Sequence, residues 1–180
     1  PQLVIKLKAA PNYQILNEVQ SSVIDIGIVT DLPGGSLFDV VEIGQEQLCL
    51  VLPKHIDKIH SSETLLRELG LISHPDAKHY LSIFFEQSEH SDFSTVNIED
   101  LPITGYVNQI SQILHPVSKG LGFTVLPKSV VDAFYDPSQL SIFSPKNRVV
   151  QRLYMVTKKS RELPKRFDVV KSTLQKSMRI

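Results

Sequence analysis

Residues 117–127 have the sequence V-S-K-G-L-G-F-T-V-L-P and predict the end of a helix, a tight turn and a strand. Upstream, apolar residues recur at helical spacing and share one helix face: Ile110, Ile113, Leu114 and Val117. Pro116 falls inside this pattern and predicts a kink or local break of the helix. The glycines at 120 and 122 supply the turn, and the strand follows over residues 123–126.

Helix and strand patterns alternate along the rest of the chain. Strands are predicted over residues 3–8, 23–29, 38–43, 47–52, 71–73, 140–143 and 149–156, and residues 102–106 are a short strand or a turn. Helices are predicted after Pro11, around 65–69, over 77–88, after Pro127 and over 163–178. The stretch 23–29 (V-I-D-I-G-I-V) is almost continuously apolar, which is typical of a strand buried on both faces of a parallel sheet. The alternation predicts an α/β protein with largely parallel sheets covered by helices.

The composition is that of an ordinary globular chain. Its 180 residues, 42% of them hydrophobic, suffice for one domain or two small lobes. A formal net charge of zero does not suit a chain built mainly to coat nucleic acid. The single Cys49 excludes an internal disulfide framework and a Cys-rich zinc site. No apolar run approaches a membrane span and no signal peptide is visible, so we expect a cytoplasmic protein with no membrane partner.

The charges are distributed unevenly. Residues 1–145 carry 8 Lys and Arg against 17 Asp and Glu, whereas residues 146–180 carry 11 against 2. A basic C-terminal segment can meet phosphate, or it can be a helix that docks with its charges in solvent. Because the same segment has a regular apolar stripe, the docked helix is favoured.

Three blocks along the chain carry a family pattern. The first combines residues 14–19 (Q-I-L-N-E-V) with residues 25–30 (D-I-G-I-V-T). The second is residues 46–53 (E-Q-L-C-L-V-L-P), and the third is the opening stretch 117–127. In order and separation, the blocks resemble the effector-binding domain of LysR-type transcriptional regulators, and they cover nearly the whole chain.

The resemblance implies a two-lobed, type 2 periplasmic-binding-protein-like fold, in which two Rossmann-like lobes are joined by two crossover strands. Residues 1–73 and 149–180 would form lobe one, and residues 74–148 would form lobe two. A small, polar, anionic effector is expected in the cleft between the lobes. The family's first strand and helix, and its N-terminal winged helix-turn-helix domain, are expected to lie outside this chain.

The resemblance also implies partners. The domain would form antiparallel homodimers, with homotetramers on DNA, and DNA would be contacted only through the absent N-terminal domain. RNA polymerase is a further partner to expect. The alternative with the same fold is a solute-binding protein of a transporter, which would need an export signal upstream. A third class, an α/β enzyme, has no visible catalytic constellation to support it.

Three predicted effector contacts lie at or near strand ends in the first half of the chain. Thr30 follows the D-I-G-I-V strand, where a hydroxyl can bind a polar ligand or bond its own backbone as a turn residue. Ser73 and His74 lie where the crossover meets lobe two. His74 can pair with an anionic ligand or be a plain surface or hinge histidine. Residues 9–11 (A-A-P), where the family often contacts ligand, are apolar here.

The remaining predicted contacts surround the third block. Asn108 is a candidate N-cap, and with Gln109 it opens a helix whose N-terminal N–H groups suit an anion. Gly122 permits a close backbone approach, so that the N–H groups of Phe123 or Thr124 can face the effector. The alternative is a plain turn that leads into the strand.

The sequence gives little support to catalysis. The six histidines are His55, His60, His74, His79, His90 and His115, and no two of them have the i, i+4 spacing of a helical zinc pair. No nucleophile elbow, phosphate-binding loop or dinucleotide fingerprint is present. We therefore expect no enzyme activity, no metal and no cofactor.

Overall fold

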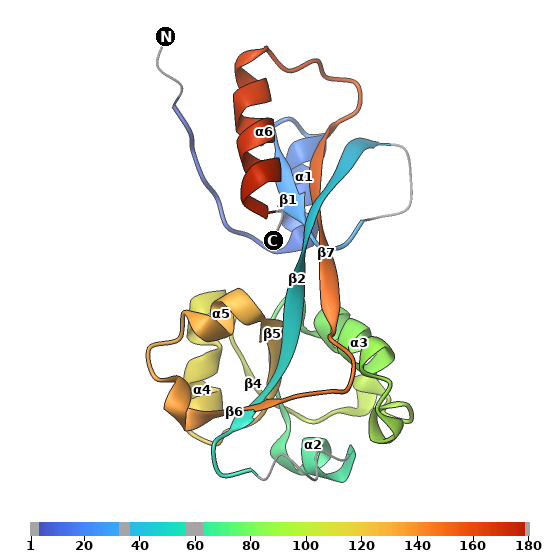
Figure 1. The fold of residues 1–180 in the computed structure, drawn as a ribbon, viewed down its shortest axis with the longest axis vertical. Helices are drawn as coiled ribbons and strands as arrows, with labels where there is room; N and C mark the ends of the chain where they lie inside the picture. Colours follow the sequence, from blue (N-terminus) through green and yellow to red (C-terminus); the bar gives the residue numbers. More distant parts are fainter. Residues whose placement is uncertain (1–3, 33–36, 57–62, 179–180) are drawn as a thin grey trace. The chain divides into compact units, whose positions relative to one another are not determined.

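The computed structural model describes residues 4–32, 37–56 and 63–178 (Figure 1). The chain divides into two compact units. Unit 1 comprises Pro1–Gln45 with Arg152–Ile180, and unit 2 comprises Glu46–Gln151. The first boundary therefore differs from the predicted one after residue 73. The physical reason is that Leu48, Leu66 and Leu71 belong to one hydrophobic cluster with the core of unit 2.

The described part of unit 1 is built from three strand segments and two helices. Its elements are α1 (Asn12–Gln20), β1 (Gly27–Val29), the first part of β2 (Phe38–Pro53), most of β7 (Val150–Lys158) and α6 (Arg166–Met178). β1 pairs antiparallel with β7, with Gly27 opposite Val156. The buried cluster consists of Ile15, Val19, Val29 and Val156. The helix predicted after Pro11 is thus confirmed as α1.

The prediction of a long, doubly buried parallel strand over residues 23–29 was wrong. Only Gly27–Val29 is a strand, its partner is antiparallel, and Ile28 is 37% exposed. The preceding residues instead close the end of α1, because the N–H groups of Val23 and Ile24 both donate to the carbonyl of Glu18. The strand predicted over residues 3–8 is also absent from its described part, residues 4–8.

Unit 2 contains the larger part of the secondary structure. Its helices are α2 (Glu63–Leu69), α3 (Ala77–Ser88), α4 (Leu114–Ser118) and α5 (Lys128–Asp132). Its strands are the second part of β2, β3 (Leu71–Ser73), β4 (Ile103–Tyr106), β5 (Thr124–Pro127) and β6 (Leu140–Phe143). Among the described residues, short 3-10 helices cover Ser91–Phe93, Ile98–Asp100, Ile110–Gln112 and Pro137–Gln139. No helix among the described residues is long and apolar enough to cross a membrane.

The strand pairing is mixed, and not largely parallel as predicted. β5 and β6 both pair antiparallel with β2, while β3 pairs parallel with β4. A further parallel bridge joins Leu71 to Phe123. The α/β fold class stands, because helices still cover these sheets (Figure 1).

β2 is the central strand of unit 2 and divides its core in two. Leu48, Leu50 and Leu52 join one hydrophobic cluster, which includes residues of α2 and α3. Cys49 and Val51 point to the other face and join a second cluster, with residues of α4 and α5. In Figure 1, α3 and the pair α4 and α5 accordingly lie on opposite sides of this strand.

The two strands predicted over 38–43 and 47–52 are one continuous strand of 16 residues. Gly44 does not break it, and the reason lies in α6. A Cβ at position 44 would collide with the backbone carbonyl of Met178, so a glycine lets the end of α6 lie directly on the strand. α6 forms over the predicted stripe, with Phe167, Val170 and Leu174 half-buried.

The helix predicted over 110–117 is broken, as Pro116 indicated, into the 3-10 helix Ile110–Gln112 and α4. Pro116 itself lies in the first turn of α4, where a backbone N–H is not needed for the helix.

Candidate functional site

In unit 2, the parallel strands bring two predicted contacts to one edge. Ser73 ends β3 opposite Tyr106, which ends β4. The N–H of Val107 donates to the carbonyl of Ser73 at 2.9 Å. Asn108 is the residue that follows Val107, so it lies near the end of β3. Carboxyl ends of parallel strands are the usual place for ligand contacts in α/β proteins. Ser73 is half-buried and Asn108 is exposed.

His74 has a structural place. Its side chain is 5% exposed, and its Nε2 lies 3.3 Å from the carbonyl oxygen of Val125, to which it donates. The ring centroid is 5.4 Å from that of Tyr80. Burial lowers the pKa of His74 to about 4, and the hydrogen bond to Val125 opposes this shift in part. The imidazole is therefore neutral at pH 7 and brings no positive charge to an anionic effector.

Asn108 and Gln109 do not open a long helix. The N-cap of the three-residue 3-10 helix is Gln109, and it makes no side-chain capping bond, so the prediction of Asn108 as an N-cap was wrong. Both side chains are exposed. The reason for the difference is the break in the helix before α4, which leaves no extended N-terminus to attract an anion.

Gly122, Phe123 and Thr124 lie against Gly70 and β3. The N–H of Phe123 donates to the carbonyl of Gly70 at 2.9 Å, and the Thr124 hydroxyl donates to the carbonyl of Ile72 at 3.1 Å. Phe123 and Thr124 are fully buried. A Cβ on Gly122 would lie 2.6 Å from the Gly70 oxygen, so glycine permits this close approach. These contacts favour the structural alternative, the turn into a strand.

Thr30 lies in unit 1, directly after β1, and is half-buried. It does not bond its own backbone. Its N–H donates to Asn12 Oδ1 at 2.9 Å, and its Oγ1 accepts from Asn12 Nδ2 at 2.8 Å. Asn12 is the first residue of α1 and was not among the predicted contacts. The only signal in the sequence was an amide directly after the apolar A-A-P segment.

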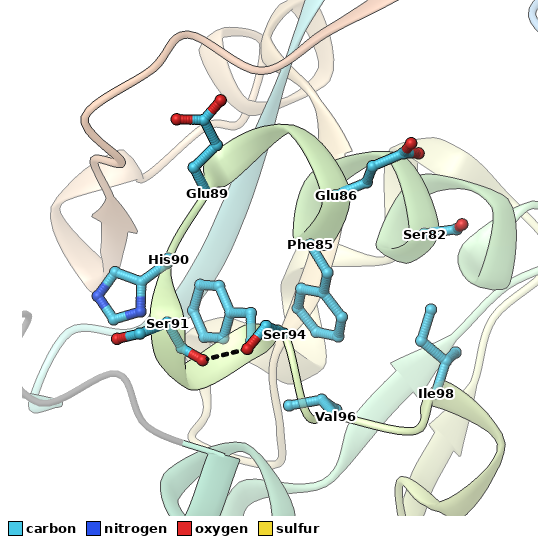
Figure 2. Close-up of a pocket in the computed structure, with 10 residues that line it drawn as sticks. Ser82, Phe85, Glu86, Glu89, His90, Ser91, Ser94, Val96 and Ile98 are labelled. Atoms are coloured by element: carbon cyan, nitrogen blue, oxygen red, sulfur yellow. Dashed lines mark hydrogen bonds between the residues drawn. The ribbon is translucent and has the colours of Figure 1, made fainter.

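Two hollows lie away from all predicted contacts. Unit 2 has one of about 390 Å³ beside the end of α3, with Phe85, Val96 and Ile98 as its apolar wall (Figure 2). In that view Glu86 and Glu89 point away from each other. Unit 1 has one of about 520 Å³ around Thr157 and the residues that follow β7.

Two further groups bear on chemistry. Cys49 is buried, and burial raises the pKa of its thiol, so this cysteine is unreactive core. Among residues 4–32, 37–56 and 63–178, no three His, Cys, Asp or Glu side chains gather as a metal site would require.

This chain is similar to a known protein family. The family model described as "LysR substrate binding domain" matches residues 1–179. The search of curated proteins gave no match.

Solved structures share the fold. The regulatory domain of CcmR from Synechocystis PCC6803 in complex with 2-PG has a TM-score of 0.75 at 16% identity, over 96% of this chain and 82% of that chain. The effector-binding domain of QuiR in complex with shikimate has a TM-score of 0.71 at 12% identity, over 94% of this chain and 78% of that one. Full-length CbnR, complexed with its target DNA, has a TM-score of 0.65 at 15% identity over 94% of this chain. This chain spans 59% of that protein.

Proposed function

Because this chain belongs to the LysR substrate-binding domain family, the ligand-sensing part of LysR-type transcriptional regulators, we propose that Thr30 is a contact for its small-molecule effector. The observation that carries the proposal is the family match over residues 1–179. Thr30 supports it locally, since this half-buried residue places a hydroxyl at the carboxyl end of a strand. Ser73 and Asn108, at the ends of β3 and β4, are proposed as contacts of unit 2.

The proposed effect of the ligand is on an equilibrium between states of the regulator. An effector shifts such an equilibrium only by its difference in affinity for the two states. In the whole protein, we place this effect in homodimers or homotetramers in the cytoplasm, with DNA bound by a separate N-terminal domain. RNA polymerase is the proposed partner of the DNA-bound assembly, and no catalytic step is proposed for this chain.

A thermal-shift screen of the chain tests for an effector. The panel starts with 2-PG and shikimate, because CcmR and QuiR were solved with them, and adds amino-acid, sulfur and aromatic metabolites. A ligand present at 100 times its dissociation constant should raise the free energy of unfolding by about 2.7 kcal/mol. The proposal fails if no compound of a broad metabolite panel gives a saturable shift.

Replacement of Thr30 by valine tests the contact itself. Valine keeps the side-chain volume and removes the hydroxyl, so the affinity for an effector found in the screen should fall about tenfold or more, as for one lost hydrogen bond to a charged group. Isothermal titration measures it. Thr173→Val, on the exposed side of α6, is the matched control and should bind like the wild type. Unchanged affinity of Thr30→Val removes Thr30 from the site.

A further inference from the structure

The two hydrogen bonds between Asn12 and Thr30 fix the direction of every proton they involve. A backbone N–H can only donate, so the atom of Asn12 that faces the Thr30 N–H at 2.9 Å must be the amide oxygen. The amide nitrogen is then the atom that faces Thr30 Oγ1 at 2.8 Å, and it must donate. The orientation of the Asn12 side chain is thereby determined by the main chain.

A consequence follows for the Thr30 hydroxyl. A hydroxyl has one proton and two acceptor lone pairs, and one lone pair is taken by the Asn12 amide. Its own proton must therefore point away from Asn12. Among the hydrogen bonds of the described residues, none uses this proton, and Thr30 is half-buried, not fully enclosed.

We propose that Asn12 is a positioning residue that holds Thr30 as a hydrogen-bond donor, and that the effector presents a carboxylate, phosphoryl or carbonyl oxygen to it. This inference rests on the proposed function of Thr30. It goes further by naming which chemistry the outward proton of Thr30 needs from the ligand: an acceptor oxygen. Asn12 acts through Thr30.

The sharpest variant is Asn12→Asp, which is nearly isosteric. Its carboxylate can still accept from the Thr30 N–H, so the link between α1 and β1 is kept. The second carboxylate oxygen can only accept, so it draws the Thr30 hydroxyl proton inward and turns the lone pairs outward. Thr30 in this variant should therefore present lone pairs only and lose its outward donor, which loss of a purely structural bond would not produce.

The experiment is an NMR titration of the Thr30 amide and methyl signals in this chain. The probes are sodium acetate and inorganic phosphate, which present acceptors, and methylammonium chloride, which presents donors, with sodium chloride as the ionic-strength reference. In the wild type we expect saturable shifts with acetate or phosphate. In Asn12→Asp we expect acetate and phosphate to bind at least tenfold more weakly than in the wild type, and methylammonium to bind more tightly.

Asn17→Asp is the matched control, because it adds the same charge to an exposed position of the same helix. It should titrate like the wild type. Absence of a saturable shift with either anion in the wild type overturns the donor role of Thr30. Equal anion binding by wild type and Asn12→Asp overturns the positioning role. If the screen finds an effector that Asn12→Asp binds as the wild type does, the inference fails while the proposed function stands; if no effector exists, the proposed function fails.

Discussion

At the scale of single residues, His74 shows how burial decides chemistry. The folded state holds its imidazole neutral with a pKa near 4, whereas the unfolded chain gives histidine an ordinary pKa of about 6.5. Between these values the unfolded state binds the additional proton. Stability is therefore fully present above pH 6.5 and is lost as the pH falls toward 4.

The expected loss from this one group between pH 7 and pH 5 is about 2 kcal/mol of unfolding free energy, at 1.36 kcal/mol per pKa unit. His74→Gln, which cannot titrate, should show a correspondingly smaller loss over the same interval in urea unfolding. His55→Gln, at an exposed position, should keep the wild-type dependence. If His74→Gln and wild type lose equal stability, the neutral buried state is refuted.

Sequence reasoning placed Thr30 directly after a strand and Ser73 at the end of one, because strand ends can be inferred from the pattern. It could not predict that His74 is buried. The local sequence after a strand is the same whether the imidazole donates to a buried carbonyl or to solvent. Asn12 was missed for a related reason. Its hydrogen bonds to Thr30 depend on the end of β1 lying beside the start of α1, a contact between residues 18 apart.

At the scale of elements, the close approach of Gly122 to Gly70 carries a prediction. Gly122→Ala would place its Cβ 2.6 Å from the Gly70 oxygen and 2.7 Å from Thr104 Oγ1, so the backbone must shift. We expect a loss of about 2–3 kcal/mol of unfolding free energy, typical of overpacking.

Gly120→Ala is the control for this change. Gly120 has a φ of +82°, but a Cβ at this position would meet nothing within 4 Å, so only the backbone conformation resists alanine. We expect a loss of about 1 kcal/mol. Chemical denaturation of both variants decides the point, and a Gly120→Ala loss equal to or above that of Gly122→Ala contradicts it.

The elements themselves were mostly predictable, and the exceptions have common causes. α3, β3 and β6 carry unambiguous local patterns and formed where the pattern indicated. The stretch 23–29 misled because continuous apolarity does not distinguish a strand from a helix-closing turn whose side chains remain partly exposed. Parallel or antiparallel pairing depends on which distant strand lies alongside, and no local pattern carries that information.

At the scale of the whole molecule, the two units differ in how much apolar surface they bury. The described residues of unit 1 contain a buried cluster of four residues, whereas unit 2 has clusters of sixteen and nine. Because local opening costs less where fewer apolar contacts are broken, amides of α1 and β1 should exchange faster with deuterium than those of α3 and β5. Native-state hydrogen exchange measures this, and equal protection of both sets would contradict it.

The leucines of β2 pack in one core, and Cys49 and Val51 pack in another. This alternation has a genetic consequence. Inserting or deleting a single codon just before Leu48 would leave the reading frame intact. It would nevertheless exchange the two sets of side chains, because a shift by one residue turns each to the opposite face. The leucines would then enter the core that Cys49 and Val51 now fill, and the reverse. In a library of such lesions, this segment should tolerate conservative replacement but no change of length.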